Sequence, residues 1–161
     1  MTEPAEPPLI NLGIGAIHVS NGGEVISTVL GSCVSVCLYD RVVGVAGMNH
    51  YMLPSAPEEK MRMVGKFGRT SIPQLLSDMQ VRGARPQNIT AKIFGGAQVM
   101  ATLTGFGHIA ENNIAEARAR LQEAGVKVVA ADVGGTHGRK VLFYTDTGRV
   151  TVREVQKSEM G

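Results

Sequence analysis

Residues 28–51 read TVLGSCVSVCLYDRVVGVAGMNHY, and this stretch decides the fold class. It contains two apolar, β-branched runs, Val34–Tyr39 and Val42–Tyr51, which are interrupted at Asp40-Arg41. Two such runs around a short polar break predict a β-hairpin with largely buried strands. The centre of the chain is therefore expected to lie in a sheet.

The segments on either side extend this pattern. The helical periodicity predicts one helix that starts at Thr70 or Ser71 and ends at Gly83, and a second over His108–Ala124 that Gly125 closes. Met52 to Gly68 is expected to be a long surface loop. Further strands are expected at Ile14–Val19, Glu24–Leu30, Ile89–Phe94, a buried Val126–Val133, Lys140–Asp146 and Arg149–Val155. The first two and the last two of these strands are expected to form hairpins. The sum is an α+β fold with layered mixed or antiparallel sheets flanked by helices.

Length and composition limit the function classes. With 161 residues, 43% of them apolar and 19% charged, the chain has the composition of one globular domain. We expect a disordered N-terminal tail over residues 1–9 and a single domain over residues 10–157. The net charge is +2 without a dense basic block, which argues against nucleic-acid binding. No apolar run is long enough for membrane insertion, and no export signal is recognised, so a cytoplasmic location is expected.

The two cysteines, Cys33 and Cys37, are expected to stay unpaired. On a strand their Cα atoms would lie about 13 Å apart, whereas a disulfide needs a separation below roughly 7 Å. His108 and His137 show no metal-ligand spacing with each other or with the cysteines. We therefore expect neither a metal nor a cofactor.

Cys33 and His50 are the residues with the clearest potential for chemistry. A two-residue turn at Arg41-Val42 would place them directly opposite each other, with Cβ atoms roughly 4.5–5.5 Å apart on one face. A register shift of two residues keeps them on that face, and a shift of one separates them. Arg-Val is a poor pair for a tight hairpin turn.

This pairing suits nucleophilic catalysis, because an imidazole can take the proton from a thiol and leave a strong nucleophile. The bend at Gly31 and Ser32, just before Cys33, can direct amide N–H groups at the oxyanion of an acyl-transfer intermediate. The competing interpretation is a core cysteine and a hydrogen-bonded structural histidine. For Cys37, inside an apolar run, the core interpretation is preferred.

Four blocks of the sequence resemble motifs of the CheD family, the chemoreceptor glutamine deamidases of bacterial chemotaxis. The resemblance covers about residues 10–155 and preserves the order of the motifs. The blocks are TVLGSCVSVCLYD at 28–40, GMNHYMLP at 47–54, KIFGGA at 92–97 and DVGGTHGR at 132–139. Two departures are visible: Ala110 replaces a glycine in a family pattern that retains Asn113, and Asn49 replaces a residue that is often small.

The resemblance implies a hydrolase that converts receptor glutamines to glutamate and ammonia, a protein-glutamine glutaminase. It implies that Cys33 is the nucleophile and His50 the base. A supporting threonine maps to Ser27 or Thr28, and Thr28 is favoured. It also implies a fold related to deamidase toxins of the cytotoxic necrotizing factor type, chemoreceptor cytoplasmic domains as substrate, and the phosphatase CheC as a partner of many members.

Two alternatives remain open at this stage. In the first, the chain is a non-catalytic interaction module of the chemotaxis apparatus with a passive Cys33. In the second, it is a small dinucleotide-binding domain, because residues 105–110 read GFGHIA and Asp132 follows at a suitable distance. A lone fingerprint of this kind is weak, and hairpins do not suit a parallel sheet.

Overall fold

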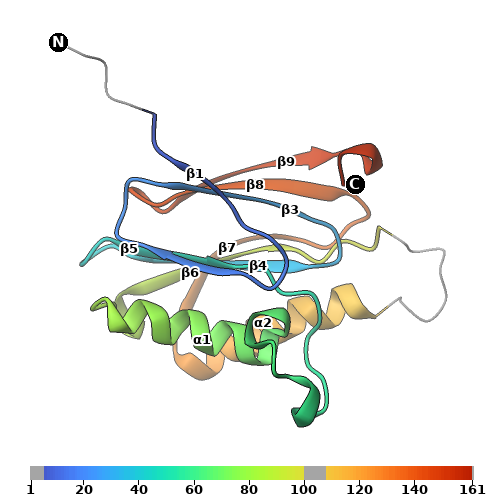
Figure 1. Cartoon of the computed structure of the whole chain (residues 1–161), viewed down its shortest axis with the longest axis horizontal. Helices are drawn as coiled ribbons and strands as arrows, with labels where there is room; N and C mark the ends of the chain where they lie inside the picture. Colours follow the sequence, from blue (N-terminus) through green and yellow to red (C-terminus); the bar gives the residue numbers. More distant parts are fainter. Residues whose placement is uncertain (1–5, 100–107, 161) are drawn as a thin grey trace.

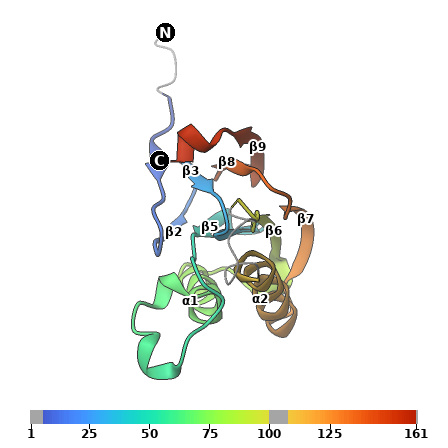
Figure 2. The same ribbon diagram turned by 90° about the vertical axis from the view of Figure 1, so that its right-hand side faces the viewer.

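The computed structural model describes residues 6–99 and 108–160, and its elements form three layers. A four-stranded sheet lies above a five-stranded sheet, and two helices cover the outer face of the five-stranded sheet (Figures 1 and 2). This arrangement confirms the expected α+β class with mixed sheets.

The four-stranded sheet has the order β1-β3-β8-β9. Its strands are β1 (Leu9–Asn11), β3 (Val25–Leu30), β8 (Gly138–Tyr144) and β9 (Arg149–Val155). Strand β1 runs parallel to β3, and the other neighbours are antiparallel. The hairpin expected at the C-terminal end is confirmed. Leu9, which the sequence analysis assigned to the tail, is the first residue of β1.

The five-stranded sheet has the order β2-β5-β4-β6-β7. Its strands are β2 (Ile17–Ser20), β5 (Val45–Asn49), β4 (Val34–Asp40), β6 (Ile89–Gly95) and β7 (Lys127–Val133). Strands β6 and β7 are parallel, and helix α2 (Ile109–Ala124) connects them. Gly125 ends α2 in the left-handed conformation, as expected.

The helices cover only one face of the five-stranded sheet, so two separate cores form. Between sheet and helices lie Val34, Val36 and Leu38 of β4 together with apolar residues of helix α1 (Gly68–Val81) and α2. Between the two sheets lie Cys37 of β4, Ala46 and Met48 of β5, and residues of β3 and β8. Side chains of β4 therefore alternate between the two cores, as a doubly covered strand requires.

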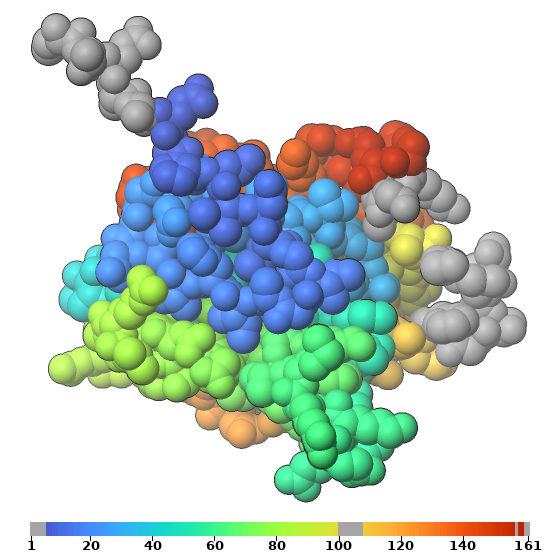
Figure 3. Space-filling model, in the orientation of Figure 1, coloured from blue at the N-terminus to red at the C-terminus, as the bar shows by residue number. Residues whose placement is uncertain are grey.

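Short 3-10 turns complete the described chain. Two of them, η1 (Glu58–Lys60) and η2 (Val64–Lys66), lie in the loop between β5 and α1, which projects from the surface (Figure 3). The others are η3 (Pro86–Asn88) and η4 (Lys157–Met160). Helix α1 begins at Gly68 with Phe67 at its N-cap, so the start expected at Thr70 or Ser71 is two or three residues late. No described helix has the length and apolarity needed to cross a membrane.

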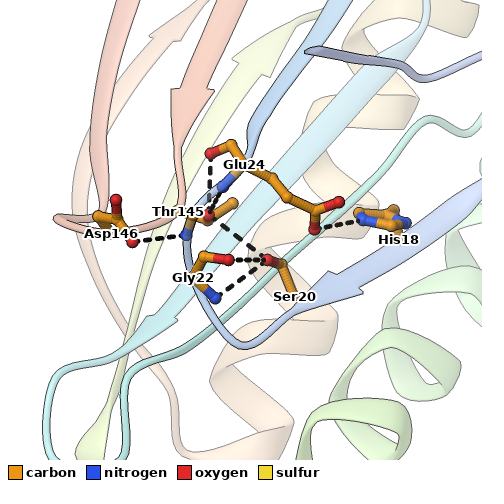
Figure 4. Close-up of polar contacts among 7 residues, drawn as sticks. His18, Ser20, Gly22, Glu24, Thr145 and Asp146 are labelled. Carbon is orange, nitrogen blue, oxygen red and sulfur yellow. Dashed lines mark hydrogen bonds and ion pairs between the residues drawn. The ribbon is translucent and has the colours of Figure 1, made fainter. Parts of the chain in front are cut away.

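The N-terminal hairpin expected from the sequence is wrong. Strand β2 pairs with β5, whereas β3 pairs with β1 and β8, so the intervening residues cross from one sheet to the other. Polar contacts stabilise this crossing (Figure 4). The Gly22 N–H donates to Ser20 Oγ (3.0 Å), and the Glu24 N–H donates to Thr145 Oγ1 (3.0 Å) at the end of β8.

Strand β7 is also more exposed than expected. It lies at the edge of its sheet, and most of its residues are exposed, including Val129. Its apolar sequence resembles that of a central strand, but pairing on one side alone leaves the other edge open.

Candidate active site

The register of the β4–β5 hairpin differs by two residues from the predicted one. Asp40 pairs with Val45, so the turn is Arg41–Gly44 rather than Arg41-Val42. The Asp40 carboxylate accepts the N–H groups of Val42 (2.8 Å) and Val43 (3.2 Å), and Gly44 adopts a φ of +74°. A buried aspartate that caps the turn and a left-handed glycine thus explain the longer loop.

Because the shift is two residues, Cys33 and His50 remain on one face although they are not directly opposite. Val34 pairs with Tyr51, and both of these side chains point into the helix-side core. Cys33 and His50 therefore face the other way, toward the four-stranded sheet. Cys33 packs against the core between the sheets.

Thr28 of β3 reaches the site from the opposite sheet. Its Oγ1 lies 2.8 Å from Nδ1 of His50 and donates a 2.7 Å hydrogen bond to the Leu12 carbonyl. Ser27 makes no such contact in the described structure, because neighbouring residues of a strand point to opposite faces. Of the two residues that the sequence left open, Thr28 is the one beside His50.

These contacts favour one tautomer of the imidazole, and His50 Nδ1 also lies 3.4 Å from the Leu12 carbonyl oxygen. A carbonyl oxygen only accepts, so the single Thr28 hydroxyl proton is used on Leu12. The Thr28 oxygen then accepts from His50, which places the ring proton on Nδ1 and leaves a lone pair on Nε2. Nε2 is buried and has no hydrogen-bond partner among the described residues. Burial also lowers the pKa of His50, which favours the neutral ring.

The thiol of Cys33 is partly exposed and is not hydrogen-bonded to His50 Nε2 in the described structure. Burial raises its pKa to about 11, partly offset by the Cys33 backbone N–H next to the sulfur. The thiol is therefore protonated at neutral pH. Cys37 is fully buried, and its pKa is raised further by burial, which agrees with the core role expected for it.

The bend before Cys33 is held by its carbonyl groups. Gly31 O accepts the Ala97 N–H (2.9 Å), Cys33 O accepts the Gly96 N–H (2.9 Å), and Ser32 O accepts from the Asn113 side chain (2.9 Å). By contrast, the Ser32 and Cys33 amides donate to no other residue within the described ranges. Two N–H groups beside the sulfur thus stay available for an incoming anion.

Three supporting residues were not assigned to the site from the sequence. Asn49 is fully buried, and its side chain accepts the Val36 N–H (2.7 Å) and donates to Ser71 Oγ (3.0 Å). Asn113 links α2 to the bend. Arg139 forms an ion pair with Asp132 (3.0 Å) and also donates to the Gly95 and Gly134 carbonyls. A polar residue inside an apolar run was the available signal for Asn49, but its partner could not be read from the sequence.

The dinucleotide fingerprint falls partly outside the described residues, since residues 105–107 are not described. Asp132, its acidic residue, is engaged by Arg139. Within the described ranges, no cluster of three or more His, Cys, Asp or Glu side chains has the arrangement of a metal site.

Comparison with known proteins adds independent information. A family model described as CheD chemotactic sensory transduction matches residues 52–154, a range that begins after Cys33 and His50. A protein of Anaeromyxobacter dehalogenans is 40% identical over 91% of this chain and 84% of its own length. A protein of Trichlorobacter lovleyi is 43% identical over 84% of each chain. The chain belongs to the CheD family.

Both relatives are named as probable chemoreceptor glutamine deamidases, as is a Sulfurimonas denitrificans CheD that is 42% identical over 84% of this chain. Among solved structures, NMB0706 of Neisseria meningitidis, a DUF152 protein, matches with a TM-score of 0.53. The match covers 91% of the CheD chain and 74% of NMB0706 at 14% identity. At that identity the likeness shows a shared fold alone.

Proposed function

We propose that this CheD protein hydrolyses the side-chain amides of selected glutamines on chemoreceptors, giving glutamate and ammonia. The names of its relatives support the reaction class. The observation that carries the proposal is the way in which the two nitrogens of the His50 imidazole are placed. Its Nδ1–H is held by Thr28, and its unpartnered Nε2 lone pair lies on the sheet face that also carries Cys33.

In the first step a glutamine side chain binds beside Cys33. His50 Nε2 takes the thiol proton while Sγ attacks the amide carbon, so a carbon–sulfur bond forms and the carbonyl oxygen becomes an oxyanion. General-base assistance is needed because the pKa of Cys33, raised by burial to about 11, leaves little thiolate at neutral pH. The N–H groups of Ser32 and Cys33, which donate to no other residue in the described ranges, are the donors for the oxyanion.

In the second step the tetrahedral intermediate collapses. The carbon–nitrogen bond breaks, and the Nε2 proton of His50 passes to the departing ammonia, which leaves a thioester on Cys33. Neutral His50 then takes a proton from water, hydroxide attacks the thioester, and the carbon–sulfur bond breaks. The sulfur recovers its proton, and the receptor retains a glutamate.

Other features implied by the family resemblance stay proposals. The substrate is the cytoplasmic domain of a chemoreceptor, which fits a cytoplasmic enzyme, and a CheC-type phosphatase is a predicted partner. A relation of this fold to deamidase toxins of the cytotoxic necrotizing factor type is predicted, as is a single domain over residues 10–157.

Mass spectrometry of receptor fragments after incubation with the protein tests the proposal. The wild type should give the mass gain of amide-to-acid conversion at particular glutamines, together with ammonia. Cys33→Ala should give neither while retaining the fold. The matched control is Cys37→Ala, four residues further along in β4 and facing the same core, which should remain active. Conversion by Cys33→Ala would exclude this assignment.

The same experiment separates the non-catalytic alternative, since an interaction module would bind receptor fragments without changing their mass. Rapid alkylation of Cys33 at neutral pH is not a useful criterion, because burial raises the pKa of the thiol to about 11. The dinucleotide alternative is tested by titration with NAD or NADP, and a lack of binding would dismiss it.

A further inference from the structure

Asn113 connects the two segments that carry Cys33 and His50. It lies in α2 and is fully buried. Its Nδ2 donates one hydrogen bond to Ser32 O and one to Met52 O, both 2.9 Å long. Ser32 directly precedes Cys33, Met52 follows His50 by two residues, and the two carbonyls lie 81 and 61 residues from Asn113 in the sequence.

A second contact lies at the same point. The Tyr51 hydroxyl donates to the backbone carbonyl of Asn113, and the Tyr51 side chain is fully buried between sheet and helices. Both segments are therefore attached to one residue of α2.

This connection matters because the β4–β5 ladder is incomplete near the site. Regular pairing ends at Cys37 and Met48, and the Val36 N–H is bound by the Asn49 side chain instead of a backbone carbonyl. The His50 N–H donates to the carbonyl of Ala16, the residue before β2 (3.2 Å). Beyond that point, the Val34–Tyr51 bridge is the one β-pairing between the two segments among the described residues. Val34 and Tyr51 exchange two backbone hydrogen bonds (3.1 and 3.0 Å), so the backbone spacing of Cys33 and His50 depends on this single pair and on the contacts that support it.

We infer that Asn113 is a positioning residue that sets the separation of Cys33 and His50 by holding the Ser32 and Met52 carbonyls on one nitrogen. The inference rests on the proposed function. The side-chain chemistry supports it, since a primary amide offers two N–H donors from a single atom. Aspartate has the same shape but has no donor when ionised and would place negative charge against two carbonyl oxygens. A displacement of about 1 Å at a catalytic pair can cost roughly 100-fold in rate.

The test compares Asn113→Asp and Asn113→Ser with Asn112→Ala. Asn112 is the exposed neighbour on the same helix and serves as the matched control. Asn113→Asp should lower kcat on receptor fragments about 100-fold with KM little changed. Asn113→Ser retains one donor, is the milder change for folding, and should lie between Asn113→Asp and the wild type. Asn112→Ala should behave as the wild type.

Alkylation of Cys33, followed on its own peptide as a function of pH, gives a readout that does not need activity. In the wild type the midpoint should lie near the Cys33 pKa of about 11. A loosened bend admits water to the sulfur, so both Asn113 variants should shift the midpoint toward the ordinary thiol value of 9.0. If folded Asn113 variants keep the wild-type kcat and the wild-type midpoint of Cys33 alkylation, the inference is overturned. If the wild type is inactive on receptor fragments but the Asn113 variants still shift the alkylation midpoint, the proposed function alone is overturned.

Discussion

At the residue scale, one hydroxyl proton determines the chemistry of the site. Thr28 uses that proton on the Leu12 carbonyl (2.7 Å), so its oxygen accepts from His50 (2.8 Å) and the ring presents a bare Nε2. Among the described residues neither Thr28 nor Leu12 is hydrogen-bonded to Cys33, yet both determine which nitrogen of His50 can act as a base. The family resemblance indicated a threonine near the site, but the Leu12 carbonyl carries no side-chain signal and could not be predicted.

Replacing Thr28 by valine should lower kcat about 100-fold, because the isosteric side chain leaves the Nδ1 proton of His50 without its acceptor. Thr28→Ser retains the hydroxyl and should recover most of the activity. Ser27→Ala, one position away on the opposite face of β3, should have little effect. Steady-state kinetics on receptor fragments measure all three, and a large loss in Ser27→Ala with an active Thr28→Val would reverse the assignment.

The pH dependence of kcat/KM should be bell-shaped. Protonated His50 cannot take the thiol proton, so activity rises as the ring loses its proton. Since burial lowers the pKa of His50, the half-maximal point should lie below 6.5. Activity should fall again near pH 11, where the Cys33 thiol ionises on its own and the shared proton is lost. If the acid side of the kcat/KM profile is centred above pH 6.5, this account is contradicted. His137→Gln, at an exposed histidine, is the control and should leave the acid side of the profile unchanged.

At the element scale, the turn after β6 supports the bend before β4. Gly96 donates to Cys33 O, and Gly95 has a φ of +105° with the Cys33 carbonyl against its Cα. A Cβ at position 95 would overlap that carbonyl. The glycine pair is therefore a close-packed support for the nucleophile segment.

Gly95→Ala should abolish measurable activity, because it combines backbone strain with displacement of Cys33. Gly134→Ala is the matched control: its φ is +83°, but nothing lies within 4 Å of the added Cβ. It should cost about 1–2 kcal/mol of unfolding free energy from strain alone and leave kcat unchanged. Urea denaturation and steady-state kinetics separate the two effects. Equal losses of kcat in both variants would argue against a specific contact at Gly95.

The elements were largely predictable, and their pairing was not. The strands β4, β6, β8 and β9 and both helices follow from apolar periodicity and from turn residues. The N-terminal hairpin predicted at the turn before Glu24 was wrong for a physical reason. A Ser-Asn-Gly-Gly turn is equally compatible with a hairpin and with a crossing between two sheets. Contacts with residues distant in sequence, such as Thr145 and Asp146, distinguish the two. For β4–β5, the Asp40 cap shifted the register by two residues, and the alternation of the strand kept the face correct.

At the scale of the whole molecule, the layering encloses a titratable group between two sheets. His50 is buried and its pKa is lowered, so the unfolded chain binds a proton more readily than the folded chain. The corresponding stability is fully present above the unfolded value of 6.5 and is lost as pH falls below it toward the folded pKa.

His50→Gln should reduce this acid sensitivity, because glutamine does not titrate. The free energy of unfolding, measured in urea at neutral pH and at about pH 5, should fall less for the variant than for the wild type. His137→Gln, at the exposed surface, should retain the wild-type difference. An unchanged pH dependence in His50→Gln would mean that His50 is not held as a neutral group in the folded protein.

Nitrogen NMR of the imidazole rings tests the central claim most directly, namely that His50 is a neutral base with its lone pair on Nε2. At neutral pH the His50 signals should report a protonated Nδ1 and an unprotonated Nε2, and Thr28→Val should weaken this preference. A proton on Nε2, or an imidazolium ring, in the wild-type protein would contradict the account.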